Sequence, residues 1–86
     1  MAKKLNRQEV FDKLAKIIKE VLCPKIEITE ATRLAEDLGA DSLALAEIVM
    51  EIEDVFVINI PNDKEGKIKT IGDSVDVILD LLSKQQ

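Results

Sequence analysis

One serine stands where a glycine-containing turn meets the start of a predicted helix. Ser42 follows Asp41 in the segment Leu38-Gly39-Ala40-Asp41-Ser42-Leu43. A serine in such a turn suggests a nucleophile, and a serine nucleophile needs a nearby base. The chain contains no histidine, and no lysine lies near Ser42 in the sequence. We therefore interpret Ser42 as an attachment point on which another enzyme acts, and not as a catalytic residue.

The local physics of this turn allows two roles for its polar side chains. Ser and Asp are both preferred at helix N-caps, so either Asp41 or Ser42 can supply the capping oxygen. The same helix end also favours an anion, because its free amides and the helix dipole carry positive partial charge. A phosphodiester on Ser42 would lie beside that positive end.

Charge divides the chain into two unlike parts. The net charge is −5, yet residues 1–25 are basic, while the stretch from Glu36 to Asp54 holds seven acids and no base. Such a stretch repels nucleic acid and attracts proteins with basic patches. The sequence therefore excludes nucleic acid as a ligand and predicts basic protein partners.

Length and composition predict a single all-α domain over residues 1–86. Only two residues are aromatic, so the core must be aliphatic. Cys23 is the only cysteine, which rules out an internal disulfide, and we expect it to be a buried thiol at a helix end. No apolar run approaches the ~20 residues needed to cross a bilayer. A monomer in a reducing, cytoplasmic setting is expected, without membrane insertion and without a metal site.

Three segments have helical spacing of their apolar residues. The first follows a capping box of Asn6 and Glu9 and ends before Pro24. The second is expected from about Ser42 to Phe56, and the last begins after the capping pair Thr70 and Asp73, with residues 83–86 frayed. The predicted core positions are Val10, Phe11, Leu14, Ile17, Ile18, Val21, Leu22, Leu45, Ile48, Val49, Ile52, Val55, Phe56, Ile71, Val75, Ile78, Leu79 and Leu82.

A long connection, residues 25–40, joins the first two helices. Thr29 or Thr32 can cap a short turn within it. Residues 62–69 are expected to form a polar turn or a short helix, anchored by Ile68. The apolar residues expected to hold the long connection against the core are Ile26, Ile28, Leu34 and Leu38.

A second face of the middle helix carries mixed side chains. Leu43, Glu47, Met50 and Asp54 fall at i, i+4, i+7 and i+11, away from the core positions. Apolar residues among carboxylates on an outward face are typical of a contact surface. One exposed Leu and one exposed Met are also ordinary in a soluble protein, so the spacing leaves both readings open.

At these residues the sequence resembles the acyl carrier proteins of bacterial-type fatty acid synthesis. The resemblance rests on Glu36 to Leu43, on Glu47-Ile48-Val49-Met50, and on Phe56 leading to Ile60-Pro61, and it spans about Leu5 to Leu82. It implies a small four-helix bundle, with three main helices, one short helix and a long ordered first loop. It further implies a non-catalytic carrier of the growing acyl chain.

The resemblance also implies roles for particular residues. Ser42 would carry a 4′-phosphopantetheine arm, transferred from coenzyme A with Mg²⁺ by a holo-carrier synthase, and acyl groups would ride on the arm as thioesters. Asp41 would lie near the modification chemistry. The face that meets basic docking patches on fatty acid synthase enzymes would comprise Leu43, Glu47, Met50, Asp54 and Ile60.

An acyl chain could enter the aliphatic core. Residues that could part to admit it are Leu34, Leu38, Val49, Ile52, Ile68 and Ile71. The resemblance supports this pocket, although aliphatic packing is also how any small bundle is built. Ala44 and the segment 55–59 are less acidic than is usual in the family. A polyketide or D-alanine type carrier, or an adaptor subunit without an arm, therefore remains an alternative.

Overall fold

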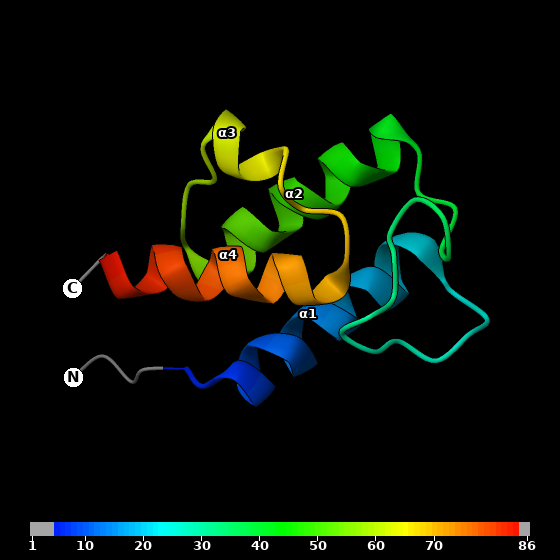
Figure 1. Cartoon of the computed structure of the whole chain (residues 1–86), viewed down its shortest axis with the longest axis horizontal. Coiled ribbons are helices and arrows are strands. Elements are labelled where there is room, and N and C mark those ends of the chain that lie inside the picture. Colours follow the sequence, from blue (N-terminus) through cyan, green and yellow to red (C-terminus); the bar gives the residue numbers. More distant parts are fainter. Residues whose placement is uncertain (1–4, 85–86) are drawn as a thin grey trace.

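The computed structural model describes residues 5–84, which form a bundle of helices (Figure 1). Within this range there is no strand, only an isolated antiparallel bridge between Arg33 and Thr70. The predicted all-α, four-helix fold with a long first loop is thus confirmed. The helices are α1 (Arg7–Leu22), α2 (Ser42–Phe56), α3 (Asn62–Glu65) and α4 (Ile71–Lys84).

Helix α1 begins and ends at local signals in the sequence. The Asn6 side chain accepts a hydrogen bond from the Glu9 N–H at 2.8 Å, and Glu9 Oε1 accepts from the Asn6 N–H at 3.1 Å, so the predicted capping box is confirmed. At the other end Cys23 adopts a left-handed conformation with φ of 48°. The prediction of a buried Cys23 thiol is wrong, since this turn carries the side chain off the apolar stripe into solvent.

Helix α2 packs its predicted stripe against α1. Ile48, Ile52 and Phe56 are buried, and Leu45 and Val49 are half-buried. Val55 is not a core residue, because 46% of it is exposed. Seven residues separate it from Ile48, so at 100° per residue it lies beside Ile48 at the edge of the stripe. Its exposure shows that the packed part of the stripe ends short of Val55.

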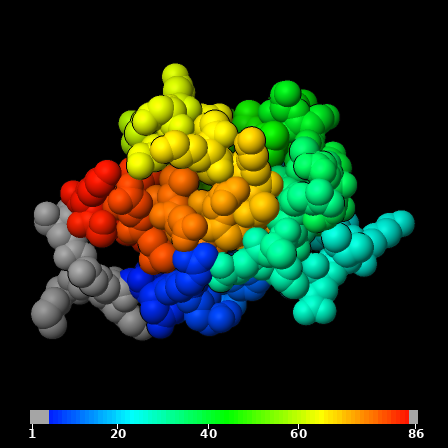
Figure 2. Space-filling view, in the orientation of Figure 1, coloured from blue at the N-terminus to red at the C-terminus, as the bar shows by residue number. Residues whose placement is uncertain are grey.

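Helix α4 starts at the second predicted capping pair. Thr70 Oγ1 accepts a hydrogen bond from the Asp73 N–H at 3.0 Å, and Asp73 Oδ2 accepts from the Thr70 N–H at 3.1 Å. The helix continues through Lys84, beyond the point where fraying was predicted, and residues 85–86 lie outside the described range. Figures 1 and 2 show α3 on the upper side of the molecule, above α4.

The long loop is fastened to the start of α4 by three backbone hydrogen bonds. The N–H groups of Ile71 and Gly72 donate to the carbonyls of Thr32 and Glu30, each at 2.9 Å, and the Leu34 N–H donates to the Lys69 carbonyl at 3.0 Å. A Cβ on Gly72 would lie 3.1 Å from the Glu30 carbonyl oxygen, so this close approach favours glycine.

Side chains add to this attachment. Ile28 and Leu34 are buried and Leu38 is half-buried, as predicted. Ile26 does not hold the loop, because 51% of it is exposed and the chain reaches the core only at Ile28. The predicted threonine turn is present: the Thr29 N–H donates to Thr32 Oγ1 at 2.8 Å.

Arg7 connects the loop to the last helix. Its guanidinium pairs with the carboxylate of Glu30 in the loop and with Asp76 Oδ1 of α4, the latter at 2.6 Å. These contacts lower the pKa of Glu30 below its ordinary value, mainly through the hydrogen bond from Arg7, and raise the pKa of Arg7. The first turn of α1, the loop and α4 are thereby joined at one charged side chain.

Candidate functional site: a serine at the start of α2

Asp41, and not Ser42, is the N-cap of α2. Asp41 Oδ1 accepts a hydrogen bond from the Ala44 N–H at 2.8 Å, and the Leu45 N–H bonds to the Asp41 carbonyl at 2.9 Å. Ser42 is the first residue of the helix and is exposed. Among residues 5–84, no side-chain hydrogen bond engages the Ser42 hydroxyl. The structure thus decides between the two capping residues and leaves the hydroxyl available.

The turn before Ser42 is held by its own hydrogen bonds. Gly39 has φ of +70°, a left-handed conformation that glycine adopts at little cost. The Ala40 N–H donates to the Leu34 carbonyl at 2.9 Å, and Ala40 is buried. The loop therefore presents Asp41 and Ser42 from a fixed support.

The charge around Ser42 is negative. Arg33, the nearest preceding base in the sequence, is engaged by Asp37 at 3.1 Å and by Glu36 at 2.7 Å. The hydrogen bond from Arg33 lowers the pKa of Asp37, which stays ionised at neutral pH. The helix N-terminus remains the favourable feature for a phosphate here.

The residues predicted to meet partner enzymes, four on α2 and Ile60 beyond it, are exposed in the structure with one exception. Leu43 and Met50 expose 69% and 63% of their surface, and Glu47 and Asp54 are also exposed. Ile60 exposes only 5%. Its backbone N–H donates to Glu53 Oε2 at 2.7 Å, which fixes this extended segment with the Ile60 side chain in the core. Ile60 therefore does not belong to this exposed face.

The predicted acyl pocket is only partly open. A cleft of about 370 Å³ lies between α2 and the segment containing α3, and it brings together Val49 and Ile68 from the predicted set. Leu34, Ile52 and Ile71 are fully buried core residues, and Leu38 is half-buried outside the lining. The cleft residues that the sequence did not assign to it are Leu45, Asn62, Glu65 and Gly66.

Of these four residues, only Leu45 could have been assigned to the cleft from the sequence, because its spacing predicts a position on the core stripe of α2. Its half-burial shows that it lies at the edge of that stripe. The polar residues of α3 had no signal, because their position depends on how the short helix folds back over α2 (Figure 1).

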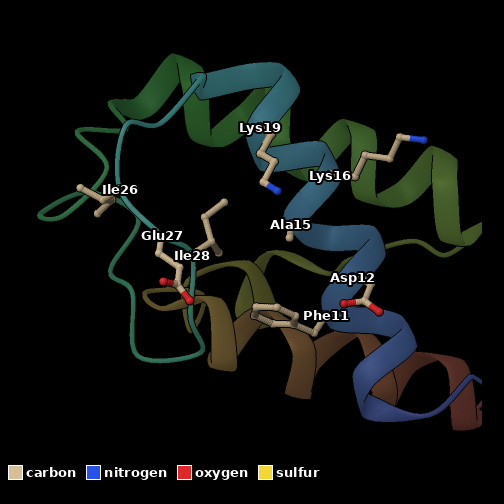
Figure 3. Close-up of a pocket in the computed structure, with 8 residues that line it drawn as sticks. All are labelled: Phe11, Asp12, Ala15, Lys16, Lys19, Ile26, Glu27 and Ile28. Atoms are coloured by element: carbon tan, nitrogen blue, oxygen red, sulfur yellow. The ribbon is translucent and has the colours of Figure 1, made fainter.

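A second groove, of about 490 Å³, lies between α1 and residues 26–28 (Figure 3). Phe11, Ala15 and Ile28 line its apolar part, and Lys19 points into it, while Ile26 points away. None of the predicted site residues lines this groove. Within the described range, no group of His, Cys, Asp and Glu side chains is arranged to hold a metal ion, and no helix is long and apolar enough to cross a bilayer.

Comparison with known proteins gives the class and then the family. The family model for the phosphopantetheine attachment site matches residues 12–78. An acyl carrier protein of Guillardia theta is 44% identical over 75 residues, covering 86% of this chain and 93% of its own. One from Lactobacillus acidophilus is 40% identical over 75 residues, covering 86% and 94%.

Solved structures agree with the sequence matches. The crystal structure of an acyl carrier protein from Thermotoga maritima has a TM-score of 0.79 at 27% identity, over 93% of this chain and 94% of that one. A thermally stable acyl carrier protein from Enterococcus faecalis has a TM-score of 0.75 at 38% identity, over 90% and 99%. The molecule is thus a phosphopantetheine-attachment domain. The chain belongs to the acyl carrier proteins.

Family membership confirms several predictions made from the sequence. The resemblance is correct, phosphopantetheine is the cofactor of the domain, and the role is that of a carrier in fatty acid synthesis. The exposed Ser42 hydroxyl at the start of α2 suits a covalent arm, because the helix end supplies free amides beside it.

Proposed function

We propose that Ser42 carries the 4′-phosphopantetheine arm. The observation that supports this most directly is that Asp41, and not Ser42, caps the start of α2. Asp41 satisfies the amide of Ala44, so the neighbouring hydroxyl of Ser42 is exposed and uncommitted. The phosphate of an arm on Ser42 would lie at the positive end of a 15-residue helix.

The chain does not catalyse its own modification. Forming the phosphodiester requires the Ser42 oxygen to bond to the phosphorus of the arm and to lose its proton, while the pyrophosphate bond of coenzyme A breaks and adenosine 3′,5′-bisphosphate leaves. The chain has no histidine, and the adjacent carboxylate, that of Asp41, is held as the cap of α2 by the Ala44 N–H. The proton acceptor and Mg²⁺ therefore belong to the holo-carrier synthase, which transfers the arm from coenzyme A. Asp41 acts as a positioning residue that fixes the backbone of the modified serine.

Partner enzymes meet the outward face of α2. Leu43 and Met50 offer exposed apolar contacts, while Glu47 and Asp54 offer charge to basic patches. Electrostatic attraction of this kind speeds encounter and sets orientation. The partners proposed are the holo-carrier synthase and the enzymes of fatty acid synthesis.

The acyl chain shelters in the cleft between α2 and α3. Its mouth is Leu45, Val49 and Ile68, and the buried residues beneath it are Ile52 and Ile71. A chain that enters further must displace those core contacts, so the cleft widens when cargo is bound. Leu34 and Leu38 would lie along the deeper part of such a path.

Residues 1–86 act as one carrier domain, working as a cytoplasmic monomer without nucleic acid. The family match to residues 12–78 supports the single domain, and the single cysteine, which cannot form a disulfide within the chain, fits a reducing compartment.

Intact mass tests the proposal. After incubation with coenzyme A, Mg²⁺ and a phosphopantetheinyl transferase, the protein should gain the mass of one arm, and Ser42→Ala should gain none. A gain that survives Ser42→Ala, or no gain in the native chain, would favour an adaptor. Testing which loading enzyme charges the holo form would separate a fatty acid carrier from a polyketide or D-alanine carrier.

A further inference from the structure

Residues 61–68, which include α3, form the outer wall of the cleft that is proposed to shelter the acyl chain. The cleft is lined from this outer wall by Asn62, Glu65, Gly66 and Ile68, and from α2 by Leu45 and Val49. No residue of α3 is buried, and Figure 1 shows α3 on the outside of the bundle, above α4. Helix α2 is fixed by its buried face against α1. The outer wall is therefore the side of the cleft that can yield to an entering chain.

Few contacts hold the outer wall in place. Among the described residues, its hydrogen bonds all close within residues 61–68, such as the bond from the Glu65 N–H to the Pro61 carbonyl at 2.9 Å. Only Lys64 and Ile68 of the outer wall are half-buried, and the other residues are exposed. Ile68 lines the cleft, so an acyl chain can replace the apolar contacts that Ile68 loses. Lys64 is not part of the lining, and a chain in the cleft cannot replace its contacts.

The two ends of the outer wall are fastened to the rest of the molecule. Just before it, the Ile60 N–H donates to Glu53 Oε2 at 2.7 Å. Just after it, the Lys69 carbonyl accepts from the Leu34 N–H at 3.0 Å. The outer wall can thus shift only between two fixed ends, and its displacement depends on what holds its middle.

An ion pair joins the middle of the outer wall to α4. Lys64 Nζ lies 3.2 Å from Asp80 Oδ2, and within residues 5–84 this is the only ion pair between the outer wall and another part of the chain. Lys84 Nζ lies 3.2 Å from the same oxygen, which is shielded from solvent. The two lysines, Lys84 more than Lys64, lower the pKa of Asp80. The carboxylate is therefore ionised at neutral pH and attracts both ammonium groups.

We propose that Lys64 and Asp80 determine how long an acyl chain this carrier shelters. The inference rests on the proposed function, in which the chain enters the cleft. An acetyl group ends outside the mouth and leaves the ion pair in place. A chain that passes Val49 and Ile68 shifts the outer wall, and Lys64 with it, while Asp80 stays on a helix held by its buried face. The ion pair then breaks, so the burial of methylenes must offset its loss before a longer chain is held.

Lys64→Met tests this role, with Lys84→Met as the matched control. Each substitution replaces an ammonium group 3.2 Å from the same carboxylate oxygen by an uncharged, unbranched side chain. Lys84 lies on α4 together with Asp80, so its replacement leaves the outer wall attached. The measurement is the melting temperature of the holo, acetyl and eight-carbon forms of the native chain and of both variants.

The two substitutions should differ in how their effect depends on the cargo. Lys64→Met should lower the melting temperatures of the holo and acetyl forms by about 3 °C, because both forms contain the ion pair. It should leave the eight-carbon form within about 1 °C of the native one, because the pair is already broken there. Lys84→Met should lower all three forms by similar amounts. Equal losses in all three forms of Lys64→Met, or no loss in any, would overturn the inference.

NMR order parameters of residues 62–66 in the apo chain give a second test that needs no cargo. They should fall in Lys64→Met and stay at native values in Lys84→Met, and unchanged values in both variants would overturn the inference. An eight-carbon form that melts no higher than the acetyl form in any of the three proteins would overturn the sheltered chain together with this inference. Failure of the native chain to gain an arm at Ser42 would instead overturn the proposed carrier function itself.

Discussion

Asp41 Oδ1 accepts a hydrogen bond from the backbone N–H of Ala44 at 2.8 Å, so Asp41 caps α2. The hydroxyl of the adjacent Ser42 is therefore not needed for capping. The arrangement links the stability of α2 to the presentation of the serine, since the same residue begins the helix and precedes the attachment point.

Replacing Asp41 should separate these two contributions. Asp41→Ala removes the cap and should lower the free energy of unfolding by about 1 kcal/mol. Asp41→Asn retains a capping oxygen and should cost much less, while removing the charge next to Ser42. Urea denaturation measures the first effect. Equal loss in both variants would show that charge, and not the capping bond, stabilises this end of α2.

Val57 should be a site of easy stabilisation. It ends α2 in a left-handed conformation with φ of 54°, which is unfavourable for a β-branched residue. Val57→Gly removes that strain, keeps the backbone bond from residue 57 to the Glu53 carbonyl, and should add about 0.5–1 kcal/mol of stability. Val55→Gly is the control, because Val55 is exposed but helical and the same change there should destabilise the protein. A loss of stability at residue 57 would contradict this account.

Substitution of Gly39 should destabilise the protein, unlike the replacement of Val57 by glycine. No heavy atom outside Gly39 and its two chain neighbours lies within 4 Å of a Cβ built at Gly39, so its φ of +70° is what opposes substitution. Gly39→Ala should destabilise the protein by about 1 kcal/mol, and Gly39→Asn by less, since Asn tolerates this conformation better. Thermal unfolding of both variants checks the order. If Ala were tolerated as well as Asn, the turn before Ser42 would have to relax.

Stability should fall as the pH is lowered below about 4.5. Arg7 lowers the pKa of Glu30, Arg33 lowers that of Asp37, and Lys84 with Lys64 lowers that of Asp80. The ordinary values are 4.5 for Glu30 and 3.8 for the two aspartates. Each group with a lowered folded pKa stabilises the fold above its ordinary value, and that contribution is lost as pH falls through the folded value.

The pH effect can be assigned by removing one cation. Unfolding free energies of the native chain and of Arg7→Met at pH 7, 5, 4 and 3 should show a shallower acid loss in the variant, because Glu30 then titrates near its ordinary value. Parallel curves would mean that Arg7 does not act through the titration of Glu30. High salt should weaken the same contribution, since these groups are exposed.

Acylation should stabilise the fold if the cleft takes cargo. About six buried methylenes are worth on the order of 5 kcal/mol before the cost of opening the core. The holo protein loaded with an eight-carbon chain should therefore melt above the acetyl form, whose two carbons are too short to cross the mouth at Val49 and Ile68. Equal melting temperatures would remove the sheltered-chain proposal.

Local signals were sufficient for most of the fold. In each capping box, Asn6 with Glu9 and Thr70 with Asp73, the two residues are only three apart in sequence. The sequence alone therefore places both helix starts. The exposure of Leu43 and Met50 followed from helical spacing in the same way. The position of Ser42 at the start of α2 also needed nothing beyond its neighbours.

The wrong predictions share a different origin. Val55 and Ile60 were placed by apolar spacing and by resemblance, but which side of each faces inward depends on the packing of α2 and of the segment before α3. Cys23 and Ile26 lie just after the end of α1, and no local sequence pattern predicts the path that the chain takes from there. The pairing of Arg7 with Glu30 and Asp76 joins residues 23 and 69 positions apart, which periodicity does not address.

The solvent-facing position of Cys23 has a practical consequence at the bench. A thiol that other molecules can approach gives one handle for attaching a dye or spin label to the apo chain by maleimide chemistry. It also means that air oxidation during storage would join two chains covalently, so preparations should be kept under reductant or made with Cys23→Ser. After the arm is attached, its terminal sulfur would compete for the same reagents, and labelling should precede conversion.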